Sequence, residues 1–279
     1  MIRGTLFVVA TPIGNLEDIT LRAIDALKTC EVIAAEDTRT AKKLLDRHGI
    51  ATPLVSFHEH SGPGKVADLV KQLEAGKSIA VISEAGTPGI SDPGEGLIHA
   101  AAASGITVVP IPGAAAFVVA LSAAGLPMER VAFEGFLPAK PADRRKRLAS
   151  LVRESRTMAF YEAPHRIAES LADMRDAFGA SRRACVAREL TKIHEEFERA
   201  TLGELAERWE KREPRGEFTV LVEGTTETEE AKAEDVETAL RAALAAGKSV
   251  SAAAKEVAAA LGRPRNVVYA LALRLEGRS

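Results

Sequence analysis

Two stretches of the chain repeat one pattern, in which a short apolar run is cut off by a glycine- and proline-rich loop and then followed by a helical segment. The first covers residues 7–20 (FVVATPIGNLEDIT) and the second residues 82–94 (ISEAGTPGISDPG). The apolar runs at residues 6–10 and 78–83 predict buried strands. Proline fixes φ and removes an amide donor, whereas glycine lets the backbone turn sharply and come close to a small molecule. Two such loops predict a ligand-binding crevice at the carboxyl ends of strands in an open α/β sheet, although glycine and proline also end strands where no ligand binds.

Strand-like and helix-like segments alternate along the rest of the first half, which is typical of a mostly parallel sheet covered on both faces. Further strands are expected at residues 32–35, 54–57 and 106–110, and helices at residues 19–27, 39–47, 65–74, 97–103 and after residue 111. Thr38 is expected to cap the helix that begins at residue 39. The predicted fold class is α/β.

A second α/β domain, with more antiparallel character, is expected beyond residues 124–127. Its strands are predicted at residues 131–136, 157–161, 184–187, 196–200 and 218–222, and its helices at 142–154, 166–178 and 202–211. Residues 224–230 (GTTETEE) predict a polar linker before helices at 236–246, 250–261 and 266–275. This tail fits a helix-turn-helix and an alanine-rich helical hairpin equally well. The expected domains are residues 1–122, 123–224 and a small helical domain at 232–279.

The composition argues against several classes of protein. The chain has 279 residues, of which 46% are hydrophobic, so it can bury a sizeable core. It has no run of about 18 apolar residues, and its N-terminus predicts a strand rather than a signal peptide, so we expect a soluble, cytoplasmic protein without membrane contact. Cys30 and Cys185 lie far apart, which indicates neither a disulfide framework nor a zinc site. The HEH sequence at residues 58–60 is only a weak metal signal.

Basic residues are concentrated in two places, although the net charge is only −2. One cluster lies around the helix expected at residues 142–154, and the other lies in the C-terminal helices. Two such clusters on a nearly neutral chain predict contact with a polyanion, while a solvated helix face explains either cluster alone equally well. The candidate phosphate contacts are Lys140, Arg144, Arg145, Lys146, Arg147, Lys248, Arg263 and Arg265.

The signatures of several common activities are absent from the sequence. The chain has no GxxxxGKS or GxxxxGKT, GxGxxG, GxSxG or HExxH motif, so nucleotide hydrolysis, common dinucleotide redox chemistry, serine hydrolysis and zinc proteolysis lack support. What remains is a pocket of glycine and proline loops without charged phosphate-binding groups. Such a pocket suits a cofactor that is bound mainly through backbone groups and apolar contacts.

Seven motifs occur in a recognisable order along the chain. They are residues 10–20 (ATPIGNLEDIT), 35–39 (AEDTR), 83–94 (SEAGTPGISDPG), 110–114 (PIPGA), 133–138 (FEGFLP), 160–166 (FYEAPHR) and 187–192 (ARELTK). Together they resemble the tetrapyrrole-methylase superfamily, and within it the branch that methylates the ribose 2′-hydroxyl of a cytidine in small-subunit ribosomal RNA. The resemblance covers nearly the whole chain. Tetrapyrrole-modifying members carry a GxGPGD-like first loop, whereas this chain has ATPIGN.

The resemblance implies two α/β domains of the tetrapyrrole-methylase type with S-adenosylmethionine (SAM) bound in the cleft between them, in a homodimer whose substrate is small-subunit RNA. We expect the assembled ribosomal particle, rather than naked RNA, to be that substrate, since few aromatic residues argue against a stacking platform for single strands. By motif, the expected cofactor contacts are Pro12, Gly14, Ser83, Ala85, Gly86, Thr87, Pro88, Pro112, Gly113, Ala114, Ala115, Tyr161 with Phe160, Ala187 and Phe218.

The chemistry implied by the resemblance adds its own constraints. Methyl transfer from a sulfonium is an in-line displacement that needs no metal, and a 2′-hydroxyl needs a base or a stabilising cation beside it. The candidates are Glu36, Asp37, Glu189 and Lys192, with Arg39 as a phosphate clamp, although a helix cap or an arginine partner explains each acid as well. Two other interpretations stay open, namely a methyltransferase acting on a small tetrapyrrole-like molecule and a non-catalytic RNA-binding protein.

Overall fold

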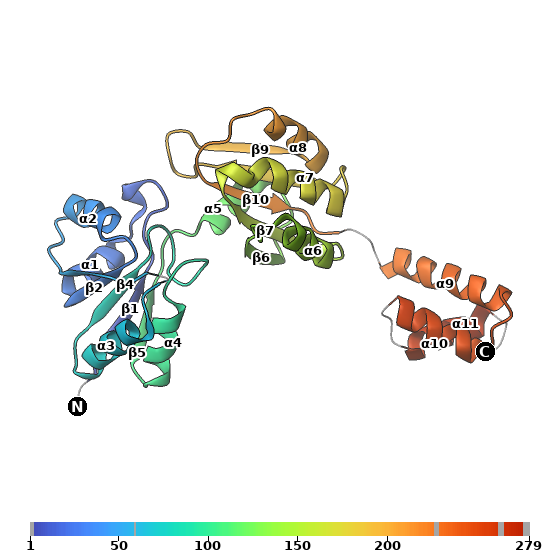
Figure 1. The fold of residues 1–279 in the computed structure, drawn as a ribbon, viewed down its shortest axis with the longest axis horizontal. Helices are drawn as coiled ribbons and strands as arrows, with labels where there is room; N and C mark the ends of the chain where they lie inside the picture. Colours follow the sequence, from blue (N-terminus) through green and yellow to red (C-terminus); the bar gives the residue numbers. More distant parts are fainter. Residues whose placement is uncertain (1–2, 59, 226–228, 262–264, 276–279) are drawn as a thin grey trace. The chain divides into compact units, whose positions relative to one another are not determined.

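The computed structural model describes residues 3–58, 60–225, 229–261 and 265–275. Contacts between residues divide the chain into two compact units, Met1–Gly224 and Thr225–Ser279. The first unit holds two five-stranded sheets, and the described part of the second unit is helical (Figure 1).

The first sheet is parallel throughout and has the strand order β3-β2-β4-β1-β5. Its strands are β1 (Thr5–Val9), β2 (Val32–Ala35), β3 (Leu54–Ser56), β4 (Ile79–Ile82) and β5 (Thr107–Ile111). β1 and β4 are neighbours, with Leu6 opposite Ile79. The carboxyl ends of these two strands therefore lie side by side at the point where the strand order reverses, which is the usual position of a ligand crevice in such sheets.

Helices cover both faces of the first sheet, as the alternating pattern predicts (Figure 1). α1 (Leu21–Thr29) and α2 (Thr38–Arg47) pack on one face through Leu27 and Leu45, and α3 (Pro63–Glu74) and α4 (Glu95–Ala103) on the other through Leu73 and Leu97. The expected cap of α2 is corrected: Asp37, not Thr38, accepts hydrogen bonds from the backbone N–H groups of Arg39 at 2.7 Å and Thr40 at 3.4 Å. Thr38 is already the first helical residue.

The second sheet is mixed, which confirms its expected antiparallel character, and has the order β6-β7-β10-β8-β9. Its strands are β6 (Val131–Phe136), β7 (Thr157–Glu162), β8 (Arg183–Arg188), β9 (Glu196–Thr201) and β10 (Phe218–Val222). Only β6 and β7 pair in parallel, and their register shifts at a bulge between Phe133 and Gly135. This bulge lies next to the site described below.

One face of the second sheet packs on α6 (Pro141–Leu151), α7 (Ile167–Phe178) and α8 (Leu202–Glu210) through a core that includes Leu148, Leu171 and Trp209. Its other face packs on α5 (Ala116–Ala124). The boundary expected at residues 122–123 thus falls inside a helix that packs on the second sheet. Two short 3₁₀ turns, η1 (Leu16–Asp18) and η2 (Pro164–Arg166), follow β1 and β7.

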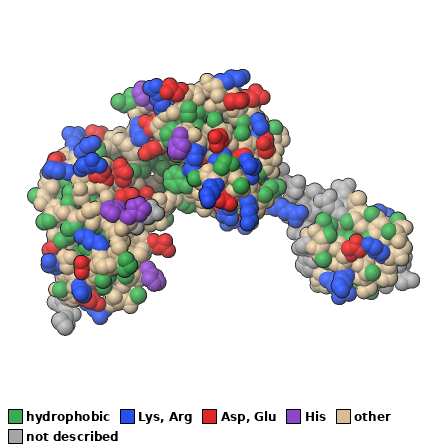
Figure 2. Space-filling view, in the orientation of Figure 1, with side chains coloured by type: hydrophobic (Ala, Val, Ile, Leu, Met, Phe, Trp, Pro, Cys, Tyr) green, Lys and Arg blue, Asp and Glu red, His purple; other side chains and the backbone are tan. Residues whose placement is uncertain are grey.

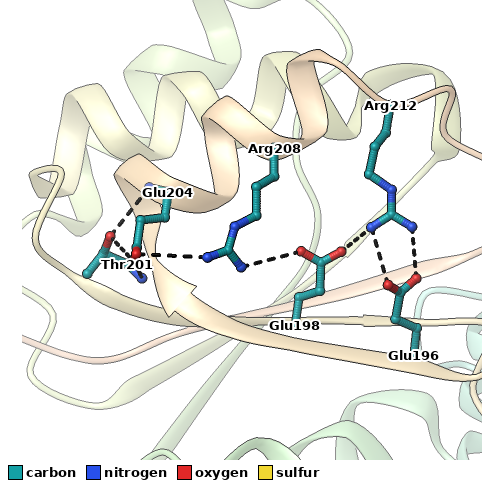
Figure 3. A network of polar contacts seen from close by, with 6 residues as sticks. All are labelled: Glu196, Glu198, Thr201, Glu204, Arg208 and Arg212. Carbon is teal, nitrogen blue, oxygen red and sulfur yellow. Dashed lines mark hydrogen bonds and ion pairs between the residues drawn. The ribbon is translucent and has the colours of Figure 1, made fainter.

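A polar network joins the edge strand β9 to α8 (Figure 3). Arg212 bridges Glu196 at 3.0 Å and Glu198, and Arg208 reaches Glu198 at 3.8 Å. Thr201 and Glu204 form a capping box at the start of α8. Charged side chains on an edge strand discourage pairing with another chain, so we assign this network a structural role.

The helical tail consists of α9 (Glu229–Ala245), α10 (Val250–Ala260) and α11 (Arg265–Leu275), which share a small core around Leu240, Val257 and Val268. α9 begins seven residues before the predicted start, so residues 229–230 of the expected linker are helical, and residues 226–228 lie outside the described residues. Among the helices in the described ranges, none has the length and hydrophobicity that a membrane span requires.

Candidate active site

The loops that follow β1 and β4 are joined directly to each other. The backbone N–H of Thr11 donates to the carbonyl of Gly86 at 2.8 Å, and the N–H of Gly86 donates to the carbonyl of Thr11 at 3.1 Å. Gly86 has a φ of +82°, which glycine adopts without the strain that a side chain would add. The crevice predicted from the two repeated stretches therefore exists as one rigid corner at the carboxyl edge of the first sheet.

A cavity of about 290 Å³ opens beside this corner. Its walls come from the loops after β1, β4 and β5 and from β6, β7 and β10 of the second sheet. Six of the expected cofactor residues line it, namely Ala85, Gly86, Thr87, Ala115, Tyr161 and Phe218. The walls are mostly apolar, and the Tyr161 hydroxyl accepts a hydrogen bond from the N–H of Phe117 at 3.3 Å.

A second cavity, of about 360 Å³, adjoins the first. Four residues line both cavities: Ile13, Ala85, Asp92 and Glu217. The second cavity is also lined by the expected residues Pro12, Gly14, Ser83, Glu36 and Lys192. A ligand of several hundred cubic ångströms can therefore contact both loops at once.

The remaining expected cofactor residues line neither cavity. They are Pro88, Pro112, Gly113, Ala114, Ala187 and Phe160. The hydroxyl of Thr87 donates to the carbonyl of Ala114 at 3.1 Å, which ties the loop after β4 to the one after β5. A Cβ on Gly113 would lie 2.8 Å from the Cβ of Ala10, so this glycine is required by packing against β1.

The hairpin between β8 and β9 reaches across to the first loop. A Cβ on Gly14 would lie 2.5 Å from Cγ of Lys192 and 3.0 Å from the carbonyl of Leu190, and the N–H of Asn15 donates to the Thr191 hydroxyl at 3.2 Å. Gly14 thus makes room for a side chain of this chain as well as lining the second cavity. This contact fixes Lys192 at the cavity.

Lys192 is held between two carboxylates, with its Nζ 2.8 Å from Glu189 and 3.0 Å from Glu217. Burial alone would lower the pKa of Lys192, but the hydrogen bonds to both glutamates outweigh it and raise the pKa. Burial likewise opposes the ionised form of Glu189, but the hydrogen bonds from Lys192 and from the Glu217 N–H hold its pKa below the usual value. Lys192 is therefore a fixed cation and Glu189 its counter-ion, and neither is suited to accept a proton.

Glu36 and Asp37 are adjacent in the sequence but have different roles in the structure. Glu36 lines the second cavity and accepts a hydrogen bond from the N–H of Glu84 at 3.2 Å. Asp37 caps α2 and pairs with Arg39 at 3.1 Å, and the hydrogen bonds from the Arg39 side chain and backbone lower its pKa. Asp37 and Arg39 thus lie outside the cavity walls, with the Arg39 side chain largely exposed.

Asp92 is the functional candidate that sequence reasoning missed. It lines both cavities, and burial raises its pKa from the usual 3.8 to about 6, aided by the charges of Glu36, Glu84 and Glu217 and opposed by a hydrogen bond with Ser83. Perturbed carboxyls in a cleft are typical of functional sites. The sequence marks Asp92 only by its place in the glycine- and proline-rich loop at residues 82–94.

The junction of the two cavities is therefore acidic. Asp92 and Glu217 line both cavities, Glu36 and Glu84 line the second, and Lys192 is the one cation among the residues that line either cavity. Figure 2 shows acidic side chains beside a hollow lined with hydrophobic ones. Apolar walls beside several carboxylates suit an amphipathic ligand that carries positive charge.

The expected phosphate contacts divide into free and occupied cations. Arg144 is buried and pairs with Asp173 at 2.6 Å and Glu169 at 3.1 Å, so its guanidinium holds α6 to α7 rather than facing RNA. Arg147 pairs with Glu134, and Arg145 lies 3.7 Å from Asp173. Lys140 and Lys146 are exposed and make no ion pair with any described residue.

In the tail, Lys248 pairs with Glu256, and Arg265 donates to the Ser251 hydroxyl at 3.2 Å. Both side chains are exposed enough to reach a phosphate as well. Arg263 lies outside the described residues.

Two sheets around a ligand-sized cavity at the carboxyl edge of the parallel one define an α/β protein that binds a small molecule between its sheets. Residues 5–206 match the family described as Tetrapyrrole (Corrin/Porphyrin) Methylases, and residues 230–276 match the RsmI C-terminal HTH domain. The chain therefore belongs to the tetrapyrrole methylase family, as the ordered motifs predict. The second match favours the helix-turn-helix interpretation of the tail.

Curated relatives cover the whole chain. It is 49% identical over 284 residues to the ribosomal RNA small subunit methyltransferase I of Pseudomonas aeruginosa, with 100% of both chains covered. It is 44% identical over 275 residues to the protein of the same name from Synechocystis sp., with 98% of this chain and 99% of the relative covered.

Solved structures share the fold at lower identity. A diphthine synthase matches with a TM-score of 0.62 at 13% identity, covering 80% of this chain and 91% of that one. The uroporphyrin-III C-methyltransferase from Thermus thermophilus, complexed with S-adenosyl homocysteine, matches with a TM-score of 0.55 at 17% identity, covering 78% and 97%. These likenesses concern the fold of the two-sheet unit alone.

Proposed function

We propose that this protein transfers a methyl group from SAM to the ribose 2′-hydroxyl of a cytidine in small-subunit ribosomal RNA. The observation that carries the proposal is the pair of joined cavities with an acidic junction, in a chain that matches relatives named ribosomal RNA small subunit methyltransferase I over its full length. The substrate position is drawn from the family resemblance. The same resemblance adds a homodimer to the proposal, and the composition of the chain adds a cytoplasmic location.

The residues present fit SAM by their chemistry. When bound, SAM supplies a methyl group on a positively charged sulfur. The apolar walls at Ala115, Tyr161 and Phe218 suit an adenosine, and the backbone of the Ala85–Thr87 segment offers polar groups without side-chain charge. The acidic junction at Asp92 and Glu217 suits the positive charge.

Asp92 is the proton acceptor in this proposal. With a pKa of about 6 its carboxyl is ionised at neutral pH, yet it is more basic than an ordinary aspartate, which is the compromise that general-base catalysis favours. It lies on the shared wall of the two cavities, where a hydroxyl held at their junction, between the first cavity and Lys192 on the second, is within the reach of a short side chain. Glu36, on the second cavity alone, is the less favourable candidate.

Lys192 has a different part to play in the reaction. Its ammonium is fixed by Glu189 and Glu217, so it offers a positive charge of constant position beside the place where an alkoxide develops. The joined loops around Thr11 and Gly86 give the site a rigid floor. Holding the reacting atoms in line accounts for up to about 7–11 kcal/mol of the barrier reduction.

Methyl transfer from labelled SAM to small ribosomal subunits tests the proposal, with naked ribosomal RNA and a porphyrinoid as competing acceptors. We expect label in the assembled particle, and mass spectrometry of digested RNA to locate it on the 2′-oxygen of one cytidine. Label in the porphyrinoid alone would favour a tetrapyrrole methylase. Calorimetry that detects no SAM binding would favour an RNA-binding protein without catalysis.

A further inference from the structure

Phe136 is a half-exposed aromatic side chain at the wall of the first cavity. It is 54% exposed, although most other large apolar side chains of the two-sheet unit are buried. The centroid of its ring lies 5.5 Å from that of Tyr161. The Tyr161 ring centroid lies 5.1 Å from that of Phe133, and the Phe133 ring stacks on Phe117 with a centroid distance of 4.4 Å. One side of the Phe136 ring is thus fixed by an aromatic row, and the rest is open to solvent.

The backbone around Phe136 is irregular in a way that aims this ring. The bulge in β6 falls between Phe133 and Gly135, and Gly135 has a φ of +65°. Arg147 pairs with Glu134 inside the bulge, so this cation of α6 holds the irregular turn in place. Bulges next to active sites commonly redirect the side chain that follows. The irregular end of β6 therefore keeps the aromatic ring of Phe136 at the cavity.

A second apolar side chain faces the same cavity from the first sheet. Ile90, in the loop after β4, is 39% exposed and lines the first cavity together with Phe136. The two segments touch, because a Cβ on Gly135 would lie 3.1 Å from the hydroxyl of Ser91. Ser91 itself has a φ of +62°, an uncommon conformation for a residue with a side chain. Both sides of this apolar pair are thus built on strained or bulged backbone.

Positive charge follows directly after Phe136 in the chain. Lys140 and Lys146 are exposed on and before α6 and make no ion pair with any described residue, and Figure 2 shows Lys and Arg side chains gathered over α6. An exposed ring followed within a few residues by free cations matches the two halves of a nucleotide, the base and the phosphate. A partner recognised through apolar contact alone would not need the cations.

We propose that Phe136, opposed by Ile90, stacks on the base of the nucleotide whose ribose is methylated, while Lys140 and Lys146 neutralise its flanking phosphates. This inference rests on the proposed function, since it names the group that positions the substrate of that reaction. Stacking on an aromatic face is tolerant of base identity. Phe136 is therefore a positioning residue that brings the 2′-hydroxyl to Asp92 on the same cavity wall, and it leaves the choice of nucleotide to other contacts.

The test compares Phe136→Ala, Phe136→Leu and Phe136→Tyr with the unchanged protein. Met128→Ala is the matched control, because Met128 is also 54% exposed in the same unit but lines neither cavity. For Phe136→Ala we expect the KM for small subunits to rise about 5- to 150-fold, the range for loss of one base stack. We expect kcat to change less, SAM affinity by calorimetry to stay unchanged, and Phe136→Tyr, but not Phe136→Leu, to restore the KM.

Three results would overturn the inference. If Phe136→Ala weakens SAM binding as much as RNA methylation, the ring belongs to the cofactor site. If the KM equals that of Met128→Ala, the ring contacts no substrate. In both cases the unchanged protein still methylates the subunits, so the proposed function stands; if it transfers no methyl group to them, both proposals fail. Thermal melting of each variant separates these results from misfolding.

Discussion

Burial of Asp92, together with the charges of Glu36, Glu84 and Glu217, predicts that its ionised side chain lowers the stability of the folded protein. A carboxyl whose pKa is raised on folding binds a proton more tightly in the folded chain than in the unfolded one, so stability falls as the pH rises between the two values. For Asp92 these are the usual 3.8 and about 6. Each pKa unit corresponds to about 1.4 kcal/mol, so the ionised Asp92 lowers the free energy of unfolding by at most about 3 kcal/mol. Because the side chain is partly exposed, solvent screening weakens this effect, and we expect it to lie within about 1–3 kcal/mol.

Asp92→Asn removes the charge and keeps the shape. We therefore expect the variant to be more stable than the unchanged protein at neutral pH, by about 1–3 kcal/mol or about 2–10 °C in the melting temperature of the unit that contains it. The difference should shrink as the pH falls from about 6, be small near about pH 4, and vanish only below 3.8, where Asp92 is protonated in both the folded and the unfolded chain. Thermal or urea unfolding, measured from about pH 4 to about pH 8, supplies the curve. Asp68→Asn, an exposed acid on α3, is the control and should show no such pH dependence.

The same variant should lose activity while it gains stability. A positioned general base contributes about 10²–10⁴-fold, so kcat should fall by that factor, and kcat/KM of the unchanged protein should rise with pH through about 6 and then level off. The reasoning is refuted if Asp92→Asn is no more stable than the unchanged protein at neutral pH, because burial beside Glu36, Glu84 and Glu217 would then not oppose the ionised form of Asp92. An unchanged kcat would remove Asp92 from the mechanism.

Three further predictions follow from the packing and the cations. Gly113→Ala pushes a methyl group to 2.8 Å from Ala10 and should destabilise the protein by about 1–3 kcal/mol in urea unfolding. Arg144→Ala leaves the largely buried Asp173 without its main partner, and melting should show a loss of about 3 kcal/mol or more with no change in the salt dependence of RNA binding. Lys140→Ala with Lys146→Ala should keep the melting temperature but reduce the slope of log affinity against log salt by about 1.5 in filter binding.

The fold could be predicted from the sequence because its strands are buried and bounded by loop residues. The limits of β2, β6 and β10 agree with the predicted residues 32–35, 131–136 and 218–222. Helix starts were less certain, because adjacent polar residues compete for the cap. Asp37 and Thr38 are both good caps, and only the backbone geometry, with Asp37 extended, decides between them.

The site could be predicted only in part, because its electrostatics depend on segments that are far apart in sequence. The residues of the two loops could be predicted to line a cavity, because the topology of the sheet places both loops at the adjacent carboxyl ends of β1 and β4. The charges around Asp92, from Glu36, Glu84 and Glu217, come from three segments that only the folded chain brings together. Arg144 lies four and seven residues before Leu148 and Leu151, a helical spacing that the sequence contains, but only the packing of α6 on its sheet shows that this face is the buried one.

The acidic junction also bears on how the site can turn over. Carboxylates gathered at Asp92 and Glu217 repel one another, and Lys192 offsets only part of that repulsion. A ligand with positive charge relieves the remainder, so the residues of the junction favour a sulfonium over the neutral thioether that is left once the methyl group has gone. The positive charge on the sulfonium strengthens binding of the donor, and methyl transfer removes that charge. The carboxylates of the junction therefore attract the donor more strongly than its neutral thioether product.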